Sequence, residues 1–286
     1  MTMIAGNNSR PVFLATDLDG TLIPLAGAAD HQASLTLLAD LLKRHEMSLA
    51  FVTGRHFASV QNAIKEFDLP LPNWILCDVG TSAYERSADG EFHHVDRYAQ
   101  TLHEIAGGVE KEPLLNLAAS ISNLRLQEPE KQSQFKTSFF VSPERLDEVV
   151  SQIDDHLIAM DAPYQIISSI DPFTNDGLID LLPTGVTKAF ALEWLCREHS
   201  VPQRSVIFAG DSGNDLAAFN AGYKTVIVGN TAASIVEVVQ ETHRSAGWPD
   251  RLYHASQHAT SGVLEGVQHF LGEVRHDGPR AGRIIL

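Results

Sequence analysis

The chain has 286 residues, a hydrophobic content of 44% and a formal net charge of -15 at pH 7. This length allows a substantial core in one or two domains, and the acidic balance argues against non-specific binding of nucleic acid or of an anionic membrane surface. The only two cysteines, Cys77 and Cys196, stand in apolar surroundings, which argues against a disulfide framework or a zinc cluster. The sequence lacks a signal-peptide core and any apolar run of about 20 residues, so we expect a cytoplasmic protein.

Strand-like and helix-like segments alternate along the chain without an internal repeat. This alternation predicts an α/β fold with a Rossmann-like parallel-sheet core. The expected core elements are strand 12–15, helix 33–45, strand 47–53, helix 57–67, strand 74–77, helix 187–199, strand 205–209, helix 216–220, strand 224–228, helix 232–242 and helix 262–271. The tail from Glu273 is expected to be loosely held.

The pattern changes between His94 and Asp180, where no strand ends in a catalytic-type cluster. The expected elements there are helix 113–122, strands 124–127 and 136–141, helix 142–159 and strands 164–169 and 177–182, with turns at Asp171-Pro172 and 175–177. This αββαββ order predicts a discontinuous core, residues 1–93 and 181–286, and an inserted cap domain, residues 94–180, that acts as a lid over the active edge.

Polar residues gather at four places in the sequence. Each place either directly follows an expected strand or begins the helix after one. Asp17 and Asp19 follow the first strand, and Thr53 ends the second. Lys188 begins a later helix, and the segment GDSGND, residues 210–215, follows the next strand. Ligands bind at the carboxyl ends of strands in open α/β sheets, so these clusters mark a candidate active site. Two acids one residue apart project differently, so one can attack a substrate while the other transfers a proton.

Each cluster also has a simpler interpretation. Asp17 and Asp19 with the following Gly20 are compatible with an ordinary turn, Lys188 with a solvated charge and residues 210–215 with a capped helix start. The occurrence of all of them in order, each next to an apolar strand, favours the catalytic interpretation.

The order and chemistry of these clusters resemble the haloacid dehalogenase superfamily of phosphohydrolases. The matching segments are DLDGT (17–21), VTGR (52–55), Lys188 and GDSGND (210–215), and the αββαββ insert is similar to the type-two cap of that superfamily. Within the superfamily, the sucrose-phosphate phosphatases and related disaccharide-phosphate phosphatases are the most similar branch. That likeness rests on GDSGNDLAAF (210–219), DLLPTGVTKAFAL (180–192) and YHASQHATSGVLEGVQHF (253–270).

Hydrolysis of a phosphate monoester is very slow without a catalyst, and attack by a carboxylate through an aspartyl-phosphate is one way to accelerate it. We assign the attack to Asp17, and we assign to Asp19 the roles of general acid and then general base. Carboxylates and phosphate repel each other, so a cation is required. Mg²⁺ prefers oxygen ligands, and Asp17, Asp211 and the backbone carbonyl of Asp19 are the expected ligands, as the resemblance also implies.

Phosphate binding is assigned to Thr53, the amide of Gly54, Lys188 and Asn214. Asp215, one helical turn after Asp211, is expected to support Lys188 or the metal site. Sugar contacts are expected from residues after the second strand, in the loop after the third strand and in the cap: Arg55, Gly80, Thr81, Ser82 and Lys136. For Arg55 a surface ion pair is an equal alternative. For Lys136 the interpretation as a strand lysine that faces solvent is favoured over a sugar contact, and the scattered histidines lack the spacing of a metal site.

The sequence therefore predicts a Mg²⁺-dependent phosphatase of a sugar phosphate, with sucrose 6-phosphate as the first candidate. Mannosylfructose phosphate or the phosphate of another compatible solute is an alternative substrate. A phosphomutase-type transferase and a non-catalytic sugar-phosphate-binding protein are alternative functions. The expected partner is the small-molecule substrate, with neither nucleic acid nor membrane, and the resemblance alone implies a partner sugar-phosphate synthase.

Overall fold

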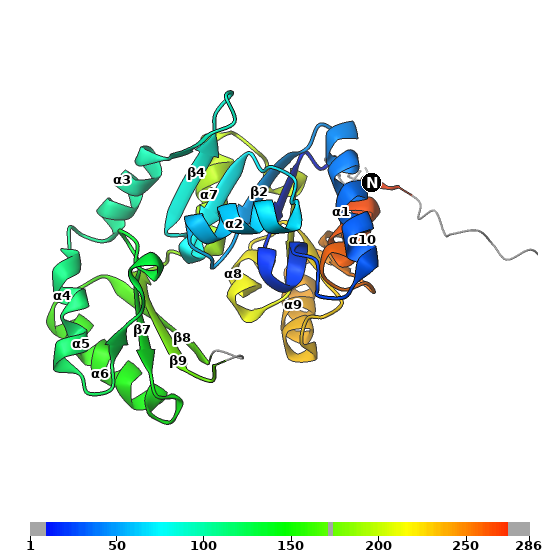
Figure 1. Ribbon diagram of the computed structural model, residues 1–286. Helices are drawn as coiled ribbons and strands as arrows, with labels where there is room; N and C mark the ends of the chain where they lie inside the picture. The colour runs from blue at the N-terminus through cyan, green and yellow to red at the C-terminus, as the bar shows by residue number, and fades with distance from the viewer. Residues whose placement is uncertain (1–9, 171–173, 274–286) are drawn as a thin grey trace, which may run out of the picture. The chain divides into compact units, whose positions relative to one another are not determined.

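The computed structural model describes residues 10–170 and 174–273 (Figure 1). The chain divides into two compact units, the first formed by Met1–Ser48 and Pro202–Leu286 and the second by Leu49–Val201. The expected turn at Asp171-Pro172 and the tail beyond Glu273 lie outside the described residues. None of the helices in the described ranges is both long and apolar enough to cross a bilayer.

The first unit is built on parallel strands in the order β12-β11-β10-β1. The strands are β1 (Phe13–Thr16), β10 (Val206–Gly210), β11 (Lys224–Ile227) and β12 (Leu252–His254). The helices are η1 (Leu18–Leu22), α1 (Ala29–Arg44), η5 (Gln203–Ser205), η6 (Gly213–Asp215), α8 (Leu216–Phe219), α9 (Ala233–Ser245), η7 (Pro249–Arg251) and α10 (Ala259–Leu271). The residues of β1, β10 and β11 are buried throughout, as expected of parallel strands covered on both faces. Helix α1 packs beside α10 (Figure 1).

The second unit contains strands of two sheets, of which the first contributes strands in the order β2-β3-β4-β5. Its strands are β2 (Ser48–Val52), β3 (Trp74–Cys77), β4 (Ser82–Arg86) and β5 (Phe92–His94). β2 and β3 are parallel, whereas β4 pairs antiparallel with both β3 and β5. The accompanying helices are α2 (Phe57–Phe67), η2 (Asp78–Gly80), α3 (Asp96–Ile105) and α7 (Lys188–Glu198).

The second sheet of this unit is antiparallel, with the order β6-β7-β9-β8. Its strands are β6 (Arg125–Leu126), β7 (Thr137–Val141), β8 (Tyr164–Ile170) and β9 (Gly177–Pro183), and its helices are α4 (Lys111–Leu115), α5 (Leu117–Ser120), η3 (Pro129–Lys131), η4 (Pro143–Arg145) and α6 (Leu146–Ala159). Figure 1 shows α4, α5 and α6 on one side of the sheet. Phe139, Ile153 and Ile179 join in one fully buried apolar cluster between the helices and the sheet. The element order is the αββαββ pattern expected from the sequence.

The expected α/β class with a parallel-sheet core is confirmed, but several elements were not predicted. The hairpin of β4 and β5, the helix α3 and the edge strand β12 were missed, and the helix expected over 113–122 consists of the two short helices α4 and α5. The hairpin escaped because β4 is only partly buried and its sequence, SAYER, is not an apolar run. Antiparallel strands with one face toward water lack the continuous apolar pattern of buried parallel strands.

Candidate active site

Three carboxylates come together at the carboxyl ends of β1 and β10 in the first unit. Asp17, Asp211 and Asp215 each offer an oxygen atom, and these oxygens all lie within 4.8 Å of one another. Asp17 and Asp215 are buried, and Asp211 is partly exposed. Buried like charges repel each other, and a cation between them removes that cost. The arrangement could therefore hold a metal ion.

The turn after β1 is shaped by its contact with Asp211. The backbone amide of Asp17 donates to the carbonyl of Ala209 at 2.9 Å, which continues the parallel pairing of β1 and β10 to the strand end. Gly20 has φ +69°, and a Cβ atom there would lie 2.3 Å from Oδ2 of Asp211. Glycine is required at this position both for the backbone conformation and for the close approach. Asp19, on the outer side of the turn, is exposed, which suits a residue that exchanges protons.

The loop after β10 is closed by Asp215. Oδ2 of Asp215 accepts hydrogen bonds from the amides of Asp211 and Ser212, each at 3.1 Å, and from Oγ of Ser212 at 3.3 Å. The bond from the Ser212 amide is one half of a capping box at the start of η6, and in the other half the Ser212 side chain accepts from the Asp215 amide. Asp215 therefore fixes the backbone that carries Asp211. Asn214 is exposed, and its Oδ1 accepts from Oγ of Ser212 at 3.0 Å.

Two neutral side chains bind the carboxylate of Asp211. Oγ1 of Thr21 donates to its Oδ1 at 3.1 Å, and Nδ2 of Asn230 donates to its Oδ2 at 3.4 Å. Asn230 was not predicted as a site residue. Its position could have indicated a role, because Gly229-Asn230 directly follows the expected strand 224–228. In the structure this strand end lies at the same edge of the sheet as the acids.

The second unit carries three of the four expected phosphate-binding residues, Thr53, Gly54 and Lys188. Thr53 is buried just after β2, its amide donates to the carbonyl of Leu76 at 2.9 Å, and its Oγ1 accepts from the amide of Arg55 at 3.2 Å. A guanidinium nitrogen of Arg55 donates to Oγ of Ser59 at 3.2 Å. The backbone of Gly54 is partly exposed between them.

Lys188 is fully buried in the first turn of α7. Thr187 caps this helix, because its Oγ1 accepts from the amide of Phe190 at 3.2 Å. A buried ammonium group is costly unless it is compensated by charge or hydrogen bonds. The alternative interpretation of Lys188 as a solvated charge is therefore wrong.

The turn after β3 contains three successive residues with positive φ, namely Asp78 at 53°, Val79 at 59° and Gly80 at 93°. A Cβ atom on Gly80 would lie 2.4 Å from the carbonyl oxygen of Thr187, so glycine permits the close approach of this turn to the start of α7. Oη of Tyr98 donates to the carbonyl of Gly80 at 2.5 Å. Left-handed backbone at non-glycine residues is unfavourable and is frequent at functional sites.

Asp78, in the same turn, forms a buried ion pair with Lys136, which directly precedes β7. Nζ of Lys136 lies 3.1 Å from Oδ1 of Asp78, and both side chains are buried, with 5% and 6% of their surfaces exposed. Lys136 therefore does not face solvent. The pair lacks hydrogen-bond geometry, and Oδ1 of Asp78 has no hydrogen-bond partner in the described part of the chain. Asp78 was not predicted as a site residue, because its partner stands far away in the sequence.

Further polar groups surround this ion pair. Oγ1 of Thr81 donates to the carbonyl of Asp78 at 2.8 Å and lies 3.5 Å from Oγ of Ser133, and Ser82 is buried at the start of β4. Nζ of Lys111 donates to the carbonyl of Ser133. Burial lowers the pKa of Lys111, and Lys136 lowers it further, while Asp78 opposes the shift. The group formed by Asp78, Thr81, Lys111, Ser133 and Lys136 is named the polar cluster below.

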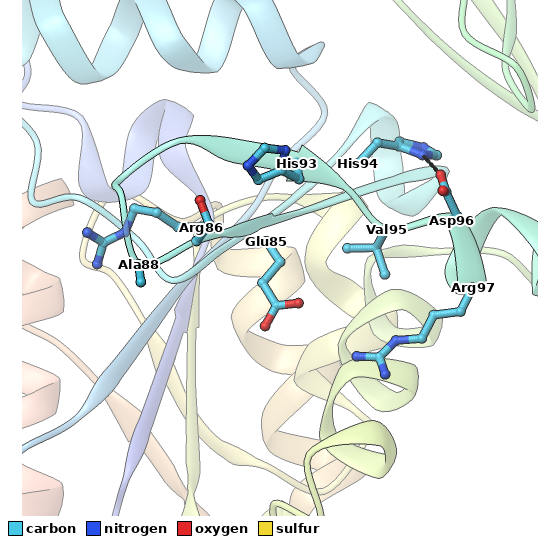
Figure 2. A pocket seen from close by; sticks show the side chains of 9 residues that line it. Glu85, Arg86, Ala88, His93, His94, Val95, Asp96 and Arg97 are labelled. Carbon is cyan, nitrogen blue, oxygen red and sulfur yellow. Dashed lines mark hydrogen bonds and ion pairs between the residues drawn. The ribbon is translucent and has the colours of Figure 1, made fainter.

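A cavity of about 570 Å³ lies elsewhere in the second unit, along the hairpin of β4 and β5. Figure 2 shows its two arginines, Arg86 and Arg97, at opposite ends of the lining residues. Arg86 donates to the carbonyl of Pro72, and Arg97 pairs with Glu198, so the cavity does not present a convergent anion site. None of the residues predicted from the sequence lines it.

Asp17, Asp211 and Asp215 are named the acid cluster below, and comparisons with known proteins show that the chain belongs to a family of phosphoric monoester hydrolases. A family model described as sucrose-6F-phosphate phosphohydrolase matches residues 10–271. The chain belongs to this family. The expected membership of the superfamily, in the branch of the sucrose-phosphate phosphatases, is confirmed.

Three relatives illustrate the range of the likeness. A protein of Nitrosococcus oceani described only as a HAD-like hydrolase is 35% identical over 93% of this chain and 73% of its own length. The mannosylfructose-phosphate phosphatase of Agrobacterium fabrum is 26% identical over 90% of this chain and 96% of its own. The sucrose-phosphatase of Synechocystis sp. PCC6803, solved in complex with sucrose and phosphate, has a TM-score of 0.71 and 26% identity and covers 92% of this chain and 98% of that one.

Proposed function

We propose that the protein is a Mg²⁺-dependent phosphatase that releases phosphate from a disaccharide phosphate, with sucrose 6-phosphate as the first candidate. The observation that carries the proposal is the gathering of Asp17, Asp211 and Asp215 at one sheet edge, with Asp19 exposed beside them. Membership of a phosphatase family supports hydrolysis over a non-catalytic binding role.

The donor set fits Mg²⁺, which prefers oxygen ligands and few protein carboxylates. Asp17, Asp211 and the backbone carbonyl of Asp19 would hold the ion, and Asp215 would support them through the loop that it closes. When bound, the ion supplies positive charge that offsets the repulsion between the nucleophile and the phosphate.

Two successive displacements account for the reaction. A carboxylate oxygen of Asp17 attacks phosphorus, and the bond from phosphorus to the sugar oxygen breaks while Asp19 donates its proton to that oxygen. A water molecule then attacks the phosphorus of the aspartyl-phosphate and gives a proton to Asp19. Cleavage of the bond between phosphorus and the Asp17 oxygen releases inorganic phosphate and restores both residues.

Four residues are assigned to the phosphate itself. Lys188 would neutralise the charge on the nucleophile and the phosphate, while Thr53, the amide of Gly54 and Asn214 would donate hydrogen bonds to phosphoryl oxygens. The complete burial of Lys188 supports this role, since a buried ammonium group needs anionic partners.

The polar cluster is assigned to the sugar. Oδ1 of Asp78 is buried beside the ammonium of Lys136, and a carboxylate oxygen can accept a further hydrogen bond, which a sugar hydroxyl would donate. Lys136 would donate to a second hydroxyl, with Thr81 and Ser82 beside it. Gly80 would permit the turn that precedes Thr81, and Arg55 would reach the same substrate. An opposite-charge pair is well suited to binding a neutral polyol. The carboxylate and the ammonium continue to compensate each other's charge while each forms hydrogen bonds with sugar hydroxyls.

A substrate panel tests the assignment. The purified protein is assayed with Mg²⁺ for phosphate release from sucrose 6-phosphate, mannosylfructose phosphate, glucosylglycerol phosphate and glucose 6-phosphate. We expect kcat/KM for one disaccharide phosphate to exceed that for glucose 6-phosphate by at least about 100-fold, because unpaired buried polar groups penalise the smaller sugar. Comparable values for all four substrates would contradict the disaccharide assignment.

Mannosylfructose phosphate is the second candidate, because a phosphatase of that substrate matches this chain over nearly the whole of both lengths. The same panel separates the two. A phosphomutase-type transferase would instead move phosphate to a sugar acceptor, and it would release little phosphate when no acceptor is added.

A further inference from the structure

Asn230 joins three segments of the first unit that are distant in sequence. Its Nδ2 donates to the carbonyl of Gly20 at 2.8 Å and to Oδ2 of Asp211 at 3.4 Å, while its Oδ1 accepts from the amide of Ala259 at 2.8 Å. It therefore connects the turn after β1, the loop after β10 and the start of α10.

The bond from Ala259 fixes the orientation of the Asn230 amide. A backbone amide only donates, so the atom that it meets must be the side-chain oxygen, and the nitrogen must face Gly20 and Asp211. A flipped amide would place its oxygen against two other acceptors. Asn230 thus presents a donor to the carboxylate that we assign to the metal.

Glu265, on α10, fixes the turn that holds Asn230. Its buried carboxylate accepts from Oη of Tyr253 at 2.7 Å, from the amide of Ser256 at 3.1 Å and from the amide of Gln257 at 3.0 Å. Both its oxygens also meet Oγ of Ser256, at 3.2 and 3.1 Å. A single carboxylate therefore organises the segment between β12 and α10.

That segment is bonded in turn to the end of β11. The amide of Gly229 donates to the carbonyl of Gln257 at 2.8 Å, and the amide of Ala259 donates to Asn230. A Cβ atom on Gly229 would lie 2.8 Å from the same carbonyl, so a side chain there would push the two segments apart. The contacts run without a break from Glu265 through the turn to Asn230 and then to Asp211.

We infer that Asn230 is a positioning residue that orients Asp211 for Mg²⁺ binding, and that Glu265 acts on the same site by holding Asn230. The inference rests on the proposed role of Asp211 as a metal ligand. Partners in the outer shell of a metal site orient the ligands, and their loss typically reduces metal affinity about 10- to 100-fold.

Calorimetric titration of Mg²⁺ into the purified, metal-free protein tests this inference independently of turnover. The variants are Asn230→Ala, Glu265→Gln and the double variant, at a temperature where circular dichroism shows all of them folded. Gln257→Ala is the matched control, because its exposed side chain belongs to the same turn but only its backbone takes part in the contacts. Asp211→Asn tests the metal ligand itself.

We expect Asn230→Ala to raise the Kd for Mg²⁺ about 10-fold and Glu265→Gln to raise it about 3-fold or more, with Gln257→Ala unchanged. The double variant should bind about as weakly as Asn230→Ala alone, because both residues act through one contact. Should Glu265→Gln fail to fold, Tyr253→Phe removes one donor to the same carboxylate and takes its place.

Three results would overturn the inference, and they are distinguishable. If Asn230→Ala binds Mg²⁺ like the wild type while Asp211→Asn does not bind, Asn230 has only a structural role. If the fold-changes of the two single variants multiply in the double variant, Glu265 does not act through Asn230. If Asp211→Asn binds Mg²⁺ normally, the metal ligand in the proposed function is itself wrong, and the positioning role is lost with it.

Discussion

The acid cluster of the first unit and the polar cluster of the second are both largely buried, but they combine charges in opposite ways. The acid cluster gathers the like charges of Asp17, Asp211 and Asp215, whereas the polar cluster joins the opposite charges of Asp78 and Lys136. Like charges in a low dielectric favour the entry of a cation, and an opposite-charge pair is already compensated. The comparison supports our proposal that the first cluster serves ion and phosphate chemistry and the second serves recognition of a neutral sugar.

Asp19→Asn gives the sharpest test within the acid cluster. We expect kcat to fall about 10²- to 10⁴-fold, because the exposed Asp19 is assigned to proton transfer. The affinity for Mg²⁺ should stay close to that of the wild type, since only the backbone carbonyl of Asp19 is assigned to the metal. Steady-state kinetics and calorimetry measure the two quantities, and loss of Mg²⁺ binding with unchanged kcat would reverse the assignment.

The polar cluster is tested by breaking its ion pair. Lys136→Met leaves the buried carboxylate of Asp78 without its cation, and we expect the free energy of unfolding to fall by about 3–5 kcal/mol. The double variant Asp78→Asn with Lys136→Met should recover part of that loss. In urea denaturation, a single variant as stable as the wild type would show that the pair is not buried as described.

The same variants separate recognition from chemistry. The folded double variant should raise KM for a disaccharide phosphate while leaving kcat/KM for p-nitrophenyl phosphate, which carries no sugar, within about threefold. Lys131→Met, on the exposed η3 of the same unit, is the control. Equal losses on both substrates would place the polar cluster with the phosphate chemistry and remove the distinction between the two clusters.

We expect Glu265→Gln to have a smaller effect on the free energy of unfolding, and this effect should depend on pH. Burial alone would raise the pKa of Glu265, but the hydrogen bonds from Tyr253, Ser256 and Gln257 outweigh it and lower the pKa below the ordinary value of 4.5. The carboxylate therefore stabilises the fold fully above pH 4.5, and this contribution is lost as the pH falls through the lowered value. We expect the variant to lose about 1–3 kcal/mol at pH 7.

The check is urea denaturation at several pH values. The difference in unfolding free energy between the wild type and Glu265→Gln should narrow below pH 4.5, the ordinary pKa of this group. A difference that is independent of pH would mean that the charge of Glu265 does not contribute.

The acid cluster could be predicted from the sequence because its residues stand next to apolar strands, in positions that parallel pairing brings to one sheet edge. The αββαββ order could also be predicted, because apolar periodicity marks most of its elements. The pairing of Asp78 with Lys136 was not readable, because it depends on a left-handed turn that brings together residues distant in sequence. Asn230 had a positional signal, but its role depends on the orientation of one amide group.

The domain boundaries remain a prediction. The sequence places the cap at residues 94–180, whereas the compact units separate at Ser48 and Pro202, so the second unit holds the expected cap together with part of the expected core. The roles of Thr53, Gly54, Lys188 and Asn214 toward phosphate are likewise proposals, and the substrate panel and kinetic variants address them.

The central claim is that Asp17 is the nucleophile of a phosphatase. The most direct measurement is phosphate release with Mg²⁺ by the wild type and by Asp17→Asn, with Asp30→Asn on the exposed start of α1 as the control. We predict rapid release by the wild type and the control, and a loss of about 10⁴-fold or more for Asp17→Asn, as for other enzymes that lose their nucleophile. Equal rates for the wild type and Asp17→Asn would contradict the account.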